Sequence, residues 1–450
     1  MRVREVSVTK LFGIFDHRIP TNLEDRITII HGPNGFGKTA LLRLLDGTFN
    51  FHSAALRAIP FERFRVDFDN RSYLEVTKPN GARRRGRKGR PGVPLLRFTY
   101  GKSQGEDVQV YEDKQEREEI EADFPLSMLD RIPNIERIGP AEWLHLPDNE
   151  VLSLDDALER FAEYLPVPRR FVRSHPEVEW LKAVRSDVSV RFIQTQRLVS
   201  RGEPRRAGRY EGEPSMVPAV RRYSQELARA IQAKLAEYAA VSQSLDRSFP
   251  ARLVSQRSTT ESTLEGLREK MDRLGEKRAR LTEAGLLAQE RDIPFEIPGQ
   301  IDETKVGVLS VYASDVEEKL SVLDEMAAKI ELLKKVINER FLYKQMAISR
   351  DEGFTFTTVD GHSLSATSLS SGEQHEVVLL CELLFSVKPN LLVLIDEPEI
   401  SLHIAWQEQF LKDLEQMTKL SGFDVILATH SPQIVSDRWD LTVELRRPGE

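Results

Sequence analysis

An apolar strand, a glycine-rich loop and an apolar helix follow one another near the start of the chain, and this order restricts the fold more than any other feature. The strand is Arg26–Ile30, the loop Gly32–Thr39 reads GPNGFGKT, and leucines at positions 41, 42, 44 and 45 open the helix. Glycines in such a loop let backbone N–H groups turn inward around a phosphate. We predict that Lys38 reaches the β and γ oxygens of ATP and that the Thr39 hydroxyl holds Mg²⁺. The predicted phosphate-binding residues are Gly32, Asn34, Gly35, Gly37, Lys38, Thr39 and Ala40.

Two further strands each lead into residues that suit phosphate chemistry. Leu391–Ile395 is a continuous apolar run, as in a strand buried on both faces, and it ends in Asp396 and Glu397. We predict that Asp396 belongs to the Mg²⁺ shell and that Glu397 orients or deprotonates the attacking water. A later strand at 424–428 leads into His430, which either touches the γ-phosphate or is a satisfied core imidazole. Its position behind the two acids favours the site.

The segment Leu369–Gln374 reads LSSGEQ and opens an apolar run at positions 377–380. Hydroxyls and bare backbone N–H groups at a helix N-terminus bind anions. Serine-rich turns also cap ordinary helices, so both interpretations stand for this segment taken by itself. The candidate nucleotide-contacting residues here are Ser370, Ser371, Gly372 and Glu373.

In chain order, these segments resemble the Walker A, signature, Walker B and switch motifs of ABC-type ATPases. Their residues (LSSGEQ, IDEPE, ATHSPQI) resemble those of the SMC, RecF and overcoming-lysogenization-defect branch. They also resemble those of stand-alone AAA-domain ATPases of antiphage defence without a Toprim domain. The resemblance implies an α/β fold: a P-loop ABC-type head with a mixed central sheet, flanking helices and a small antiparallel sheet, interrupted by a short helical arm or lid. It also implies that the signature of one chain caps the ATP held by another, in a homodimer or a higher homo-oligomer.

The resemblance assigns two further roles near the nucleotide. ABC enzymes place a glutamine after a strand, where it senses Mg²⁺ and the attacking water. Gln196 is our choice for this metal-contacting and catalytic role. Gln194 is the reserve, because the sequence does not decide which of the two glutamines occupies this position. In this fold an aromatic residue in the turn after the first strand often lies against the adenine. Phe12 and Phe15 are the candidates, although a core role explains either ring equally well.

The composition fits a large protein without a general affinity for nucleic acid. At 450 residues we expect two or three domains, and the formal net charge of −7 gives no overall basic bias. Cys381 is the single cysteine, which excludes internal disulfides and fits a reducing compartment. No apolar run approaches the ~18 residues that span a bilayer, and the first residues lack a signal core. We expect a cytoplasmic protein without membrane contact.

Three domains are expected: residues 1–198 as the first half of the ATPase head, 199–344 as an inserted helical arm, and 345–450 as the second half of the head. Within the arm, apolar residues recur at helical spacing over 227–245, 264–281 and 316–337. Helices of roughly thirty residues reach only about 45 Å, far less than an SMC tether. The three helices either pack on each other as a lid, which we favour, or lend a face to a partner.

A basic loop interrupts the antiparallel strands predicted between residues 61 and 111. Arg83–Arg90 holds six basic side chains and no acid, whereas residues 106–123 hold nine acids and two bases. The basic loop either grips the phosphates of DNA or RNA or is a solvated hairpin tip neutralised by the acidic run. Both interpretations stand.

The motifs together predict Mg²⁺-dependent ATP hydrolysis. Resemblance to defence ATPases of the Septu and PARIS types suggests a sensor that controls a separate effector nuclease. No Toprim-like acidic cluster follows Pro432, so we expect any cutting activity on another chain. A DNA-repair ATPase of RecF character is the alternative, and a transporter subunit is disfavoured because the insert between Gln196 and Leu369 is too long.

Overall fold

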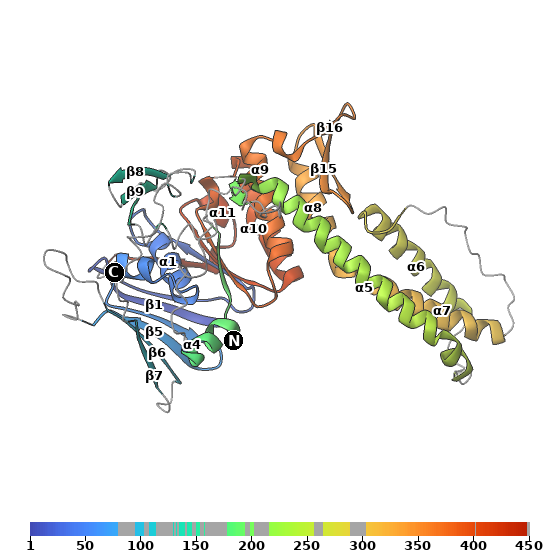
Figure 1. Cartoon of the computed structure of the whole chain (residues 1–450), viewed down its shortest axis with the longest axis horizontal. Helices are drawn as coiled ribbons and strands as arrows, with labels where there is room; N and C mark the ends of the chain where they lie inside the picture. Colours follow the sequence, from blue (N-terminus) through green and yellow to red (C-terminus); the bar gives the residue numbers. More distant parts are fainter. Residues whose placement is uncertain are drawn as a thin grey trace, which may run out of the picture. The chain divides into compact units, whose positions relative to one another are not determined.

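The computed structural model describes residues 1–79, 95–102, 108–113, 129, 132, 135–139, 142–145, 150–153, 157, 178–193, 199–201, 216–255, 264–288, 303–400 and 402–447. The chain forms two compact units, Met1–Val217 with Val387–Glu450, and Pro218–Ser386. We call them the head unit and the arm unit and describe each by itself (Figure 1). The basic loop at 83–90, the acidic residues 114–123 and both glutamines, Gln194 and Gln196, lie outside the described residues.

A five-stranded parallel sheet lies at the centre of the head unit. Its order is β11 (Val190–Ile193), β17 (Leu392–Asp396), β18 (Asp424–Thr429), β3 (Ile27–His31) and β19 (Thr442–Glu444). Every pairing in it is parallel, and the three middle strands are buried along nearly their whole length. Strands covered on both faces need continuous apolar sequence. The strands predicted at 26–30, 391–395 and 424–428 are therefore confirmed.

An antiparallel sheet of six strands forms a second layer of the head unit, drawn in blue in Figure 1. Its strands β2 and β5 alternate buried and more exposed side chains, so one face of the sheet packs into the core. The leucines of helix α1 (Lys38–Phe49) belong to that same core. The hairpins predicted between residues 61 and 111 are confirmed. The strand order is β2 (Phe15–Pro20), β1 (Val3–Leu11), β4 (Arg63–Phe68), β5 (Ser72–Thr77), β6 (Leu96–Lys102) and β7 (Gln109–Asp113).

Shorter elements complete the head unit. Two small sheets join β8, β9 and β10 in one case and β12 and β13 in the other. Their bounds, with those of the remaining helices, are α2 (Ser53–Ala58), β8 (Ile135–Gly139), β9 (Glu142–His145), β10 (Glu150–Ser153), α4 (Glu179–Asp187), β12 (Val199–Arg201), β13 (Met216–Pro218), η5 (Pro398–Ile400), α10 (Ile404–Ser421), α11 (Pro432–Val435) and η6 (Trp439–Leu441).

Helices dominate the arm unit. The long helix α5 (Ala219–Ser255) and the helix α6 (Leu264–Glu283) both pack against α7 (Glu303–Ser321), and α8 (Asp324–Arg340) follows (Figure 1). The third helical run predicted from the sequence is divided between α7 and α8. The physical reason is visible at the break, because Asp324 and Glu325 occupy the first turn of α8, where the helix dipole favours negative charge.

The second part of the arm unit is a small antiparallel sheet followed by a helix. The sheet contains β14 (Lys344–Ser349), β15 (Gly353–Thr358) and β16 (Ser363–Leu364), and the chain continues through η3 (Ala366–Ser368) into α9 (Ser371–Cys381) and the π-helical η4 (Glu382–Ser386). The sequence-based boundary placed residues 345–386 with the head, whereas these residues group with the arm helices.

A close backbone approach explains this grouping. The Ser224 hydroxyl on α5 donates to the carbonyl of Glu352 at 2.6 Å and accepts the N–H of Phe354 at 3.0 Å. Between these two residues, a Cβ on Gly353 would lie 1.9 Å from the Ser224 carbonyl oxygen. Helix α5 therefore contacts the β14–β15 turn at a distance that only glycine permits.

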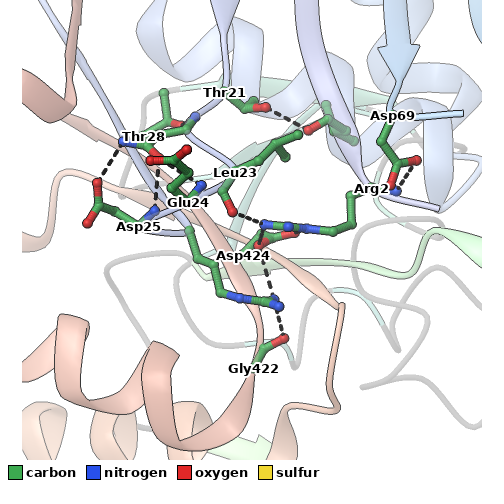
Figure 2. A network of polar contacts seen from close by, with 12 residues as sticks. Arg2, Thr21, Leu23, Glu24, Asp25, Thr28, Asp69, Gly422 and Asp424 are labelled. Atoms are coloured by element: carbon green, nitrogen blue, oxygen red, sulfur yellow. Dashed lines mark hydrogen bonds and ion pairs between the residues drawn. The ribbon is translucent and has the colours of Figure 1, made fainter. Parts of the chain in front are cut away.

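In the head unit, a polar network joins the start of β1 to the start of β18 (Figure 2). The guanidinium of Arg2 donates to both oxygens of Asp424, at 2.8 and 2.6 Å, and to the carbonyl of Leu23 at 2.9 Å. Arg26 donates to the carbonyl of Gly422 at 2.6 Å. Both side chains of the Arg2–Asp424 pair are largely buried, at 20% and 13% exposed. Such a bidentate pair fixes the N-terminal strand against the central sheet.

We expect Asp424→Asn to destabilise the head unit by about 2 kcal/mol, because it removes the negative charge and replaces one of the two oxygens that accept from Arg2 with a donor. Asp440→Asn is the matched control, since Asp440 also accepts from an arginine but is exposed. Urea unfolding followed by circular dichroism measures both variants. An unchanged unfolding midpoint for Asp424→Asn would contradict the role of this pair.

Candidate functional site

The glycine-rich loop joins β3 to α1, as the sequence predicted. Gly37 is the N-cap of α1 and has φ = 90°, a conformation that favours glycine, and a Cβ there would lie 2.4 Å from the side chain of Leu11. No side chain caps the N-terminus of α1, and its first turn contains no acid. The first N–H groups of a helix have no intrahelical acceptor. The backbone at Lys38, Thr39 and Ala40 is therefore suited to receive an anion such as a phosphate.

Lys38 and Thr39 are both held in place at the start of α1. The buried ammonium of Lys38 donates to the carbonyl of Gly32 at 2.7 Å and to that of Pro33 at 3.2 Å, so it lies inside the loop. The hydroxyl of Thr39 donates to Oδ1 of Asp396 at 3.2 Å. This bond joins the loop to the end of β17, across 357 residues of sequence. The two residues predicted to hold Mg²⁺ are thus neighbours.

Burial raises the pKa of Asp396 to about 6, the hydrogen bond from Thr39 opposes the shift, and the nearby charge of Glu397 adds to it. A cation would relieve the cost of keeping this carboxylate ionised. Among the described residues, no group of three or more His, Cys, Asp or Glu side chains is arranged to hold a metal. A Mg²⁺ ion at Thr39 and Asp396 would therefore take most of its ligands from phosphate oxygens and water, as Mg²⁺ commonly does.

Glu397 follows β17 in an unusual conformation. Its φ is 42°, in the left-handed region, and its N–H donates to the carbonyl of Ala428 at 2.9 Å. A non-glycine residue in this region costs about 1 kcal/mol, and such strain is concentrated at functional sites. The side chain is 29% exposed, unlike the largely buried Asp396. Glu397 can therefore reach a water molecule.

His430 lies immediately after β18 and is partly exposed, so the core interpretation of this residue does not hold. Its Nδ1 is 3.0 Å from Oε1 of Glu399 and 3.8 Å from Oε1 of Glu397. The backbone N–H of His430 and the hydroxyl of Thr429 also donate to Oε1 of Glu399, at 2.9 and 2.7 Å. Glu399 was not among the predicted site residues. The sequence signal that could have found it is a third acid, close behind Asp396 and Glu397.

The signature segment of the arm unit forms a capped helix start. The hydroxyl of Ser370 accepts the N–H of Glu373, and the carboxylate of Glu373 accepts the Ser370 N–H at 2.8 Å, which is a capping box. Burial would raise the pKa of Glu373, but hydrogen bonds from Lys344 and Ser370 outweigh it and lower the pKa. Ser370 and Ser371 are exposed. The N–H groups of Ser371 and Gly372 have no intrahelical acceptor and are open to an external anion.

The two aromatic candidates for the adenine differ in burial. Phe15 is buried, with its ring 5.5 Å from that of His17 and 5.3 Å from that of Phe36, so the core interpretation fits it. Phe12 is 45% exposed, and its ring edge would be 3.5 Å from a Cβ on Gly37. Of the two rings, Phe12 is the one that lies at the phosphate loop with a free face.

No helix in the described part of the chain is both long enough and apolar enough to cross a lipid bilayer.

The chain is similar to the SMC head domain from Thermotoga maritima, with 11% identity over 97% of this chain and 93% of that one, and a TM-score of 0.33. It is also similar to the Pyrococcus furiosus Smc head domain bound to the C-terminal domain of ScpA, with 9% identity, 99% and 94% coverage, and a TM-score of 0.29. The SmcHead bound to the C-winged helix domain of ScpA gives 10% identity, 100% and 95% coverage, and a TM-score of 0.33.

No curated protein matches the chain significantly. The profile of the family described as "AAA domain, putative AbiEii toxin, Type IV TA system" matches residues 27–436. This range includes the phosphate loop, the signature, the acids Asp396 and Glu397 at the end of β17, and His430. The predicted P-loop α/β head and the predicted AAA-type resemblance are confirmed. Because the match covers most of the sequence, the chain belongs to this AAA-domain family of P-loop ATPases.

Proposed function

We propose that two copies of the chain bind and hydrolyse ATP at shared interfaces, as a homodimer or a higher homo-oligomer. The observation that carries the proposal is the hydrogen bond between Thr39 and Asp396, because it joins the phosphate loop to the carboxylate strand beside Glu397. The exposed signature turn supports the shared interface. It offers the N–H groups of Ser371 and Gly372 to an anion that another copy would present.

The residues of one copy would divide the reaction among them. Lys38 and the first amides of α1 bind the β- and γ-phosphates, and Phe12 lies against the adenine. When bound at Thr39 and Asp396, with Gln196 as a further contact, Mg²⁺ supplies positive charge to the phosphate oxygens. Glu397 orients the attacking water and His430 contacts the γ-phosphate. Ser370, Ser371, Gly372 and Glu373 of the second copy then close the site.

We further propose that nucleotide state controls a separate effector, a nuclease, in antiphage defence. The resemblance of the motifs to those of defence ATPases supports this step. The mechanism of control would use the signature helix, because it is part of the arm unit.

Lys38→Ala should abolish ATP binding, because it removes the ammonium from the phosphate loop. Glu397→Gln should keep binding but lower turnover about 100-fold or more, because it removes the group that activates water, and it should accumulate an ATP-bound dimer. Fluorescent-nucleotide titration, phosphate release and light scattering measure these effects. Lys412→Ala and Glu408→Gln, both exposed on α10, are the matched controls. Turnover at the wild-type rate in either site variant would refute the assignment.

A mixing experiment tests the shared site. Ser371→Arg should block the signature turn, and neither it nor Lys38→Ala should hydrolyse ATP alone. Mixed one to one, they should recover about a quarter of the wild-type turnover, because random pairing makes half of the dimers mixed and each mixed dimer contains one intact site of two. Ser363→Arg, an exposed serine of β16, is the control and should stay active. Absence of any recovery, together with nucleotide-independent association, would exclude the shared-site proposal.

The effector proposal predicts that protection of cells against phage requires both this chain and the product of an adjacent reading frame. Plaque counts with each gene alone, with both, and with Lys38→Ala in the pair measure this. Protection should be lost in Lys38→Ala, because the effector would no longer receive the nucleotide signal. Protection by the neighbour alone, or by the pair regardless of Lys38, would contradict control by this ATPase.

A further inference from the structure

Two carboxylates face the same ring nitrogen of His430, at different distances. The Nδ1 atom is 3.0 Å from Oε1 of Glu399, within hydrogen-bond distance, and 3.8 Å from Oε1 of Glu397, which is beyond it. The imidazole therefore lies nearer to the carboxylate that the proposed mechanism does not use, and the backbone N–H of His430 donates to that same carboxylate. The carboxylate proposed to act on water is left unbound by the ring.

The two glutamates also differ in environment. The side chain of Glu399 is 6% exposed, whereas that of Glu397 is 29% exposed. Oε1 of Glu399 accepts from the Thr429 hydroxyl and from the His430 N–H, and His430 Nδ1 lies 3.0 Å from it. Its Oε2 is buried and has no hydrogen-bond partner among the described residues. A buried carboxylate with this arrangement depends strongly on the donors that it does have.

The backbone of Glu399 is fixed by a second set of bonds. The buried amide of Gln407 on α10 donates to the carbonyl of Glu399 at 3.1 Å and to that of Leu402 at 3.2 Å. The hydroxyl of Ser431 donates to the same amide at 3.1 Å. Gln407 thus joins the turn that carries Glu399 to the turn that carries His430. These bonds hold the backbone of both turns, and so the distance between Glu399 and His430.

The chemistry of the contact determines the state of the ring. An ionised carboxylate only accepts hydrogen bonds, so an imidazole nitrogen that bonds to one must carry the hydrogen, whether the ring is neutral or charged. Nε2 is then the nitrogen left for a ligand. Buried carboxylates hold histidines in this way in hydrolases, where the wrong tautomer greatly reduces the rate.

We propose that Glu399 is a positioning residue for His430. It holds Nδ1 so that Nε2 faces the γ-phosphate. It also keeps the imidazole away from Glu397, whose carboxylate stays available to water. This inference rests on the proposed ATP hydrolysis, and it adds to that reaction a residue that acts only through another.

The first test measures the ring itself and needs no activity. Imidazole ¹⁵N chemical shifts of the full-length protein are recorded at alkaline pH, where histidine is neutral, and the His430 signal is the one missing in His430→Gln. The wild type should show the Nδ1–H tautomer. Glu399→Met, which removes the acceptor at similar length, should shift the population toward Nε2–H. An Nε2–H ring in the wild type would overturn the proposal whatever the variants do.

The second test is a double-mutant cycle on ATP turnover. Glu399→Gln keeps an acceptor without charge and should lower kcat roughly tenfold, and Glu399→Met should lower it about 100-fold, with KM changed less than twofold. In the His430→Gln background, Glu399→Gln should cost nothing more, because its effect passes through the ring. Glu408→Gln is the matched control, an exposed glutamate of α10 without a site contact.

The two failures are distinguishable. If the wild type shows no ATP turnover, the proposed function fails, while the tautomer measurement still decides the contact. If the wild type turns over ATP and Glu399→Gln matches it, the positioning role is refuted and the ATPase proposal is unaffected. The positioning role is also refuted if the double variant loses kcat by the product of the two single losses, those of Glu399→Gln and His430→Gln. Glu399 would then act independently of the ring.

Discussion

The hydrogen-bond register of three parallel strands determines where the chemistry of this protein occurs. In that register Asp396 at the end of β17 pairs with Ala428 of β18, and Thr429 of β18 pairs with His31 of β3. The residues that come next in each strand are therefore placed along one edge of the sheet. They are Gly32, Glu397 and His430, which come from three widely separated parts of the sequence.

Negative charge at that edge must be balanced. Asp396, Glu397 and Glu399 lie close enough for the two glutamates to raise the pKa of Asp396, although burial is the larger cause. The structure separates their environments: Asp396 bonds Thr39, Glu399 bonds His430, and Glu397 is held in a left-handed turn with its side chain partly exposed. Groups of one chemical type thus acquire different roles from their surroundings, which is the usual way that sites tune carboxylates.

The arm unit shows a second constraint, on the signature helix. Helix α5 packs against α9, and α8 does so through a buried ion pair between Arg340 and Glu376. The side chains of that pair are 7% and 1% exposed, so separating them would leave a buried charge without a partner. Helices α5 and α8 are therefore both fixed to α9, and the proposed mechanism uses the first backbone N–H groups of α9.

The sequence by itself determined the phosphate loop, the apolar strands and the residues at their ends, because these features depend on local spacing and on the continuous burial of parallel strands. Loop glycines, strand-end acids and the capped signature turn all follow from residue type and order, so Lys38, Asp396 and Ser370 could be located without coordinates. Only the tertiary structure decided which carboxylate bonds His430, since Glu397 and Glu399 are the same residue type and only two residues apart. Only it placed residues 345–386 with the arm helices, because the contact of Ser224 with the turn at Gly353 joins segments that no local pattern relates.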